Sequence, residues 1–257
     1  KLMRPIKTNT PKNTYGPCRG EYKQTFSTPM FQGKANLNHE IVAEHCRDVV
    51  GRIPKGNTET EYTTYFEHDL REETHNQPWF NDFANQMKDT YIEFIRKMWH
   101  FDVTGISRHD IHLFSWVNVY NEPHSHSVHN HVKSRLSGTY YVSTDSNSEP
   151  ITFYNPNMSS LFGHGASDGQ HEDGQYTFQG TPGGQTEMAF YAETGDFLLW
   201  PSYLTHAVPQ GRSRGKGMIG EIKEYERISI SFNLQHAEDL GSYHHGDPFD
   251  YGVLTNE

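Results

Sequence analysis

The spacing of apolar residues predicts two helices in the N-terminal half of the chain. Asn38 can cap a helix that runs to about residue 50 and is ended by Gly51. The apolar residues expected on one side of this helix are Ile41, Val42, Cys46, Val49 and Val50. The segment 78–99 has the stronger helical period, with apolar residues three and four apart: Phe80, Phe83, Met87, Tyr91, Phe94 or Ile95, and Met98. We expect this apolar stripe to pack on a sheet.

The rest of the N-terminal half lacks a clear period. Residues 1–36 are rich in Lys, Thr, Asn, Pro and Gly and are expected to form an extended arm or short strands. Residues 54–76 are polar and charged, and we expect a loop with irregular structure there.

From about residue 110 the pattern changes to short strands separated by turn residues. The strands are expected at 111–120, 138–143, 151–154, 187–192, 196–200, 206–208 and 227–234. Helices followed by a run of short strands are typical of a mainly β fold, a sandwich or jelly-roll barrel supported by helices. We therefore expect residues 1–109 to form an arm and helices packed on the barrel, 110–235 the barrel, and 236–257 a tail. The segments 155–186 and 209–225 are expected insertions in the barrel.

The composition of the chain bears on which partners and which cellular compartment are expected. The formal net charge of −10 argues against a surface for duplex nucleic acid or anionic membranes. Two cysteines, Cys18 and Cys46, cannot build a disulfide framework, which favours a reducing, cytoplasmic location. The apolar runs are too short to cross a bilayer.

A cluster of histidines predicts a metal site. His124, His126, His129 and His131 stand close together in sequence, and either pair has the i, i+2 spacing that points two side chains the same way on an extended segment. We favour His129 and His131, because they lie closer to the strand 138–143, and we expect the remote His206 to complete the site. Imidazole alone does not select among iron, zinc, copper and nickel.

The third ligand stays open at this stage. The usual facial triad of iron has two histidines and one carboxylate. If His131 takes the place of that carboxylate, the triad consists of three neutral histidines; a carboxylate such as Glu122 or Asp145 is the alternative.

The segment 227–234 alternates between apolar and polar residues. Its polar face is either exposed to water or, in a barrel that holds a ligand, turned inward. In the second case Arg227 can bind the distal carboxylate of a dicarboxylate, with a further hydrogen bond from Ser229. Tyr120, Asn118 and Tyr140 lie on strands that can supply additional polar contacts.

Taken together, these stretches resemble the 2-oxoglutarate- and Fe(II)-dependent oxygenases, in a branch similar to the prolyl 4-hydroxylases. The resemblance covers about residues 110–235. The stretches that carry it are Ser115–Tyr120, His129-x-His131, Ser137–Tyr141, Pro201–Val208 and Arg227–Asn233. It implies a double-stranded β-helix, with Fe(II) on His129 and His206 and 2-oxoglutarate on Arg227 and Ser229. It also implies a dioxygenase that uses O2, hydroxylates a C–H bond and releases succinate and CO2.

Two other functions are compatible with the same residues. One is a cupin-like metalloenzyme that uses three histidines without 2-oxoglutarate, and the other is a non-catalytic barrel that binds a partner. The substrate implied by the resemblance is a protein side chain or a small molecule, and the sequence does not name it.

Overall fold

The computed structural model of the protein describes residues 28–56, 60–120, 125–131, 134–144, 148–156, 187–208 and 226–237. Within these residues the helices are α1 (His39–Gly51), α2 (His68–His75) and α3 (Phe80–Met98), with a short 3-10 turn at Arg108–Asp110. The strands are β1 (Phe31–Lys34), β2 (Ile111–Tyr120), β3 (His126–His129), β4 (Leu136–Ser143), β5 (Ile151–Tyr154), β6 (Glu187–Phe190), β7 (Asp196–Pro201), β8 (His206–Val208) and β9 (Arg227–His236).

The strands form two antiparallel sheets. One has the order β1-β7-β4-β9-β2, and the other has the order β3-β8-β5-β6. From β2 to β5 each successive strand belongs to the opposite sheet, and the same alternation returns from β6 to β9. This winding of the chain between two facing sheets is the double-stranded β-helix, which confirms the predicted barrel.

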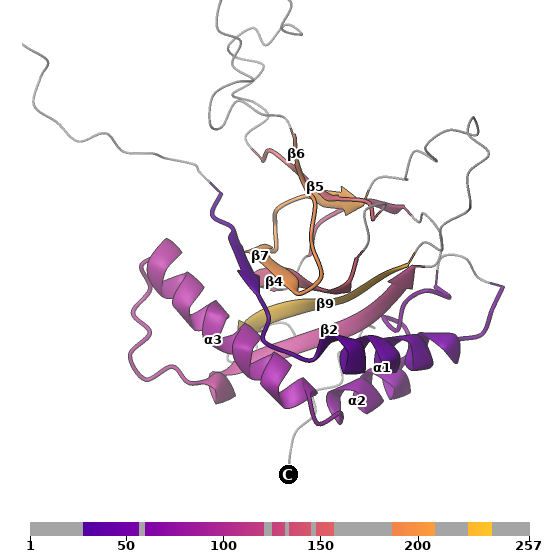
Figure 1. Ribbon diagram of the computed structural model, residues 1–257. Helices are drawn as coiled ribbons and strands as arrows, with labels where there is room; N and C mark the ends of the chain where they lie inside the picture. The colour runs from indigo at the N-terminus through magenta and orange to yellow at the C-terminus, as the bar shows by residue number, and fades with distance from the viewer. Residues whose placement is uncertain are drawn as a thin grey trace, which may run out of the picture.

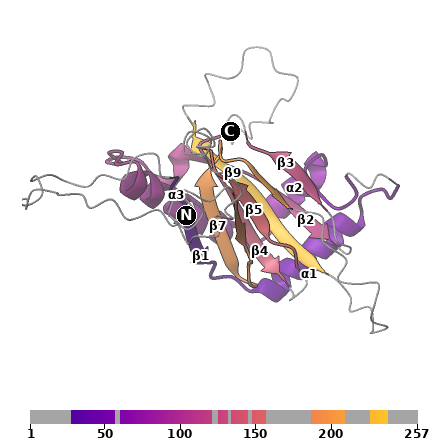
Figure 2. The same ribbon diagram turned by 90° about the horizontal axis from the view of Figure 1, so that it is seen from above.

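The three helices lie on the side of the larger sheet that faces away from the smaller one (Figure 1). Seen from above, the strands lie over the helices (Figure 2). Helix α1 contacts β2 and β4, and α3 contacts β2. The main hydrophobic core fills this layer and includes Phe83, Met87 and Tyr91 of α3 and Ile230 and Phe232 of β9. The ring centroids of Phe83 and Phe232 are 5.6 Å apart. The helices therefore cover one face of the sheet and leave the other face for the interior of the barrel.

Strand β9 shows this division most clearly. One face belongs to the core between the helices and the larger sheet, and it carries Ile228, Ile230, Phe232 and Leu234. Since side chains alternate along a strand, Arg227, Ser229, Ser231 and Asn233 point the other way, into the barrel. Of the two readings of this polar face, the inward one is correct.

The N-terminal half matches the sequence prediction at the start of α1 and in the arm before it. Asn38 caps α1 as expected, with its side chain accepting a hydrogen bond from Ile41 N at 3.3 Å. Strand β1 of the expected arm pairs with β7 at the edge of the larger sheet. Residues 1–27 and 238–257, and most of the two expected insertions, lie outside the described residues.

Three details of the sequence prediction were wrong. Residues 68–75 form helix α2 rather than part of a loop, and only Thr74 of this helix is buried, so no apolar period marks it. Ile41 and Met98 were expected in the buried stripes of their helices, but they are 55% and 46% exposed. Ile41 lies in the first turn of α1 and Met98 is the last residue of α3, and side chains at helix ends can turn away from the sheet.

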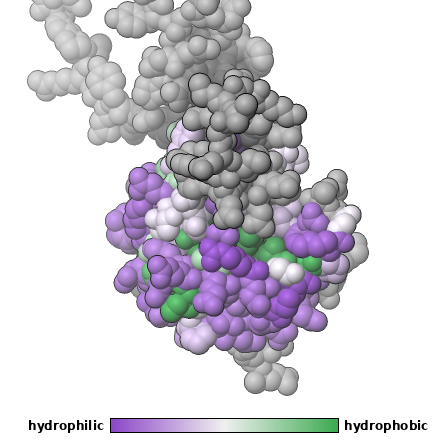
Figure 3. All heavy atoms as spheres, turned by 45° about the vertical axis from the view of Figure 1, so that its right-hand side comes forward, coloured by the Kyte–Doolittle hydropathy of each residue, from purple (hydrophilic) through white to green (hydrophobic). Residues whose placement is uncertain are grey.

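The face of the molecule in Figure 3 is mostly hydrophilic where its residues are described, with hydrophobic side chains gathered in small groups. None of the helices in the described ranges is both long enough and apolar enough to span a membrane.

Gly138 of β4 has no room for a side chain, and this provides a test of the packing. A Cβ atom there would stand 2.4 Å from Phe232 Cζ and 2.6 Å from the carbonyl oxygen of Leu198. We expect Gly138→Ala to lower the free energy of unfolding by about 1–3 kcal/mol through overpacking, measured by chemical denaturation. Gly51→Ala is the control, because a Cβ atom at Gly51 meets nothing within 4 Å. Equal stability of the two variants would contradict the close packing at Gly138.

Candidate metal and co-substrate site

The structure brings three of the predicted histidines together at one end of the barrel interior. His129 on β3 is paired directly with His206 on β8, and their ring centroids are 4.3 Å apart. His131 follows just after β3, where its backbone N–H donates to the Ser202 carbonyl at 2.9 Å. One nitrogen from each of the three side chains lies within 4.8 Å of the others. Three imidazoles at this separation can surround one metal ion.

Hydrogen bonds orient each ring so that one nitrogen is free to bind a metal. Nδ1 of His129 lies 2.7 Å from the Ser127 carbonyl oxygen, and Nδ1 of His206 lies 2.9 Å from the Leu204 carbonyl oxygen. Nδ1 of His131 lies 2.8 Å from Oδ1 of Asn233. Each of these oxygens can only accept, so each Nδ1 carries the proton and each Nε2 presents a lone pair. This set of donors fits a divalent transition metal.

Burial keeps these imidazoles in the form that metals bind. It lowers the pKa of His131 to about 4 and that of His206 to about 3, and the neighbouring histidines lower both further. Burial also lowers the pKa of His129. At neutral pH the three rings are therefore uncharged, and a metal does not have to displace protons from them.

The opposite end of the pocket holds a buried positive charge. Arg227 is 3% exposed, and its guanidinium lies 5.4 Å from the centre of the Tyr120 ring and 5.3 Å from that of Tyr141. Its Nε atom has no hydrogen-bond partner among the described residues. Glu226, the adjacent carboxylate, is bound to Arg47 instead. A buried guanidinium in this position needs an anion as partner.

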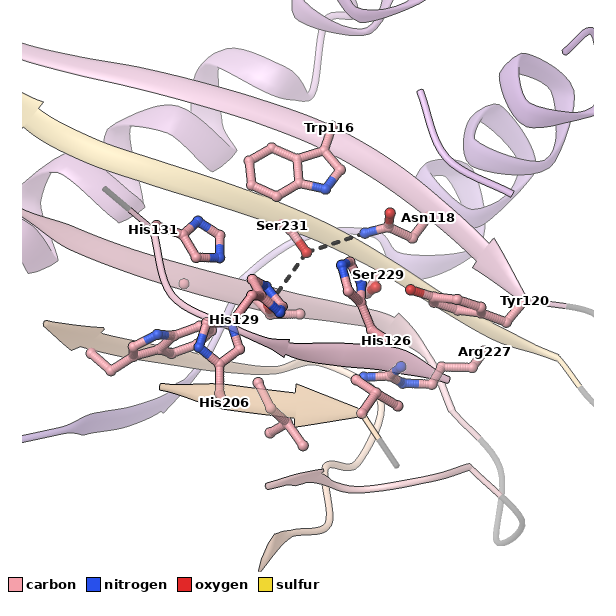
Figure 4. Close-up of a pocket in the computed structure, with 15 residues that line it drawn as sticks. Trp116, Asn118, Tyr120, His126, His129, His131, His206, Arg227, Ser229 and Ser231 are labelled. Carbon is pink, nitrogen blue, oxygen red and sulfur yellow. Dashed lines mark hydrogen bonds between the residues drawn. The ribbon is translucent and has the colours of Figure 1, made fainter. Parts of the chain in front are cut away.

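Polar side chains connect the two ends of the pocket (Figure 4). Ser229 and Asn118, which were predicted to contact a co-substrate, line it together with Tyr120. The side-chain amide of Asn118 donates to Ser231 Oγ at 3.1 Å, and its Oδ1 has no partner in the described ranges. A small dicarboxylate reaching from the histidines to Arg227 would lie along this row.

The prediction for Tyr140 was wrong. Its ring lies in the core beneath the helices, and its hydroxyl is hydrogen-bonded to Nδ1 of His39 at 2.5 Å. The adjacent residue, Tyr141, has the opposite orientation on β4 and is the tyrosine that faces Arg227. Both faces of β4 are buried, so the sequence offers no alternation that would separate the two tyrosines.

Trp116 and His126 also line the pocket, although neither was predicted as a site residue from the sequence. Trp116 lies two positions before Asn118 on β2, so the alternation of that strand already places it inward. Its ring stacks on His131 at 5.9 Å. His126 lies between the three histidines and Arg227 in Figure 4, with its ring stacked 4.5 Å from that of His129. Glu122 and Asp145, the alternative carboxylate ligands, fall outside the described residues.

The geometry predicts that His131, and not His126, binds a metal together with His129 and His206. We expect His131→Ala to weaken Co(II) binding by more than about 100-fold, since outer partners of ligands are already worth about 10–100-fold. His126→Ala should keep the affinity within a few-fold, because His126 is not among the three histidines that converge. Titration of the metal-free protein, followed by the visible absorption of bound Co(II), measures both. The reverse order of effects would move the site to His126.

Comparison with known protein families gives one match, which lies over the strands of the barrel. Residues 114–233 match the family described as "Putative 2OG-Fe(II) oxygenase". No curated protein is significantly similar to the chain in sequence.

Three solved structures illustrate the similarity in fold. The prolyl-4-hydroxylase of Pseudomonas putida is 10% identical, with 82% of this chain and 89% of that chain covered and a TM-score of 0.47. HygX from Streptomyces hygroscopicus, with nickel and 2-oxoglutarate bound, is 12% identical, with 81% and 83% covered and a TM-score of 0.45. EvdO2 from Micromonospora carbonacea var. aurantiaca, complexed with 2-oxoglutarate, is 8% identical, with 84% and 92% covered and a TM-score of 0.47.

Such distant likenesses carry no argument about activity. The family match is more specific, because it spans the strands that supply the three histidines and Arg227. That match covers a little under half of the chain, and over these residues the chain is similar to the 2-oxoglutarate- and Fe(II)-dependent oxygenases.

Proposed function

We propose that this protein is a dioxygenase that binds Fe(II) through His129, His131 and His206 and binds 2-oxoglutarate through Arg227. With O2 it hydroxylates a C–H bond of its substrate and releases succinate and CO2. Bound iron, together with 2-oxoglutarate and O2, supplies the oxidising chemistry, and the protein supplies binding, orientation and exclusion of water.

One observation carries this proposal: the pocket has three converging imidazoles at one end and the buried guanidinium of Arg227 at the other, and the Nε atom of Arg227 has no hydrogen-bond partner among the described residues. A guanidinium can hold a carboxylate by two parallel hydrogen bonds. A metal on the histidines can bind the 2-oxo acid group at the other end of the same molecule. A cupin-like enzyme without 2-oxoglutarate leaves the buried charge of Arg227 without a role.

Each part of the pocket wall has a separate task in this proposal. Tyr120 and Tyr141 hold the guanidinium from two sides by cation–π contact and restrict where it can point. Ser229, opposite Asn118 in the register of β2 and β9, offers a hydroxyl to the co-substrate. Trp116 covers the ring of His131 and keeps water away from one side of the metal site.

We propose that the substrate is a protein side chain or a small molecule. The net charge of −10 opposes the approach of duplex nucleic acid. We propose a cytoplasmic location, as expected for a chain that has only two cysteines.

Replacement of Arg227 tests the co-substrate site. We expect Arg227→Gln to weaken 2-oxoglutarate binding by at least about 30-fold, since loss of one partner of a buried charge pair costs about 2–5 kcal/mol. The dissociation constant can be measured anaerobically in the Fe(II)-loaded protein, from the weak visible band that appears when metal and 2-oxo acid bind together. Fe(II) affinity measured without 2-oxoglutarate should not fall, because Arg227 is not among the residues that converge on the metal site.

Arg96→Ala is the matched control, because Arg96 is an exposed arginine paired with Glu93 on α3. It should bind 2-oxoglutarate as the unmodified protein does. Equal affinity of Arg227→Gln and Arg96→Ala would reject Arg227 as the co-substrate anchor. The absence of the band in the unmodified protein with metal bound would reject 2-oxoglutarate altogether.

A further inference from the structure

Asn233 of β9 is the hydrogen-bond partner of His131, the histidine that would replace the carboxylate of the usual iron triad. Its side-chain oxygen accepts from Nδ1 of His131 at 2.8 Å. We propose that Asn233 is a positioning residue, which holds His131 as the Nδ1-protonated tautomer and so lets a neutral imidazole serve as the third metal ligand. This inference rests on the proposed function. It gives a role to Asn233, which orients a metal ligand and does not bind the metal itself.

A series of serine hydroxyl groups holds Asn233 in this orientation. Ser134 Oγ donates to Ser202 Oγ at 2.8 Å, Ser202 Oγ lies 2.8 Å from Ser137 Oγ, and Ser137 Oγ donates to Asn233 Oδ1 at 2.8 Å. Every hydroxyl hydrogen can thus point towards the amide oxygen of Asn233. With two donors already directed at Oδ1, the amide cannot turn its NH2 group towards His131 without losing both bonds.

His131 is held by the same network on its main chain. Its backbone N–H donates to the carbonyl oxygen of Ser202, the residue whose hydroxyl belongs to the series. On the other side, the ring of Trp116 stacks on the imidazole with an interplanar angle of 22°. The ring plane, the tautomer and the position of His131 are therefore fixed together.

The other two histidines are oriented by a different means. Their Nδ1 atoms bond to the main-chain carbonyls of Ser127 and Leu204, each two residues earlier in the chain. Only His131 depends on a side chain, and that side chain comes from a strand 102 residues away. A substitution can therefore remove the outer partner of His131 without touching the other two.

Metal titration of the Asn233 variants tests the proposal without any need for turnover. We expect Asn233→Ala to weaken Co(II) binding by about 10–100-fold, the usual effect of losing an outer partner of a metal ligand. Asn233→Asp keeps an acceptor at the same place and should bind Co(II) at least as tightly as the unmodified protein. Ser137→Ala, which removes the second donor to Asn233, should give a smaller loss. Gln235→Ala is the control on the same face of β9, and it should leave the affinity unchanged.

A double-mutant comparison separates a positioning role from a general structural one. In the His131→Asp background the third ligand is a carboxylate, which needs no Nδ1 partner, so adding Asn233→Ala should change Co(II) affinity by less than about 3-fold. An equal loss in both backgrounds would overturn the proposal, as would an unchanged affinity of the single variant Asn233→Ala. If the unmodified protein binds no Co(II), the proposed function itself fails; if it does bind, failure of the Asn233 series leaves the three-histidine site intact.

Discussion

The register of β9 is the constraint on which the rest of the structure depends. This strand is paired on both sides, with β2 and with β4. Its apolar face completes the core beneath the helices, and its polar face carries both Arg227 and Asn233. A shift by one residue would bury these polar groups under the helices and turn Ile228 and Ile230 into the pocket. The register that places the apolar side chains of β9 in the core therefore also places its polar side chains in the site.

The site has an unusual balance of charge for an iron centre. The three converging side chains are all neutral histidines, so no carboxylate in the described set would offset the two positive charges of a bound metal. Arg227 adds a third positive charge in the same pocket. A 2-oxo dicarboxylate carries one negative charge at each end of the molecule. The bound metal and Arg227 therefore both favour its binding. We expect such a site to depend more strongly on its co-substrate for tight metal binding than a site that has its own carboxylate.

The sequence was sufficient for those features that depend on local pattern. The alternation in 227–234 predicted a strand, and the i, i+2 spacing of the histidines predicted that two of them point the same way; both depend only on the two-residue period of a strand. The choice of His129 and His131 came from their position just before the strand 138–143. The choice between Tyr140 and Tyr141 was not available from the sequence, because both faces of β4 are buried. Helix α2 was missed for the opposite reason, since almost none of it is buried.

Contacts between distant segments could not be predicted from the pattern. The bond between His131 and Asn233 joins residues 102 positions apart, and it requires the pairing of β4 with β9 to be known. The same is true of the two tyrosine rings around Arg227, which come from β2 and β4. These partners decide the tautomers and the charge of the site, so the chemistry becomes clear only when the strands are placed.

The most direct test of the account is a crystal structure of the protein grown anaerobically with Fe(II) and 2-oxoglutarate. We predict iron bound to Nε2 of His129, His131 and His206, with the distal carboxylate of 2-oxoglutarate on the guanidinium of Arg227. A carboxylate side chain in place of His131 would contradict the three-histidine site. A 2-oxoglutarate molecule bound away from Arg227 would contradict the assignment of the co-substrate pocket.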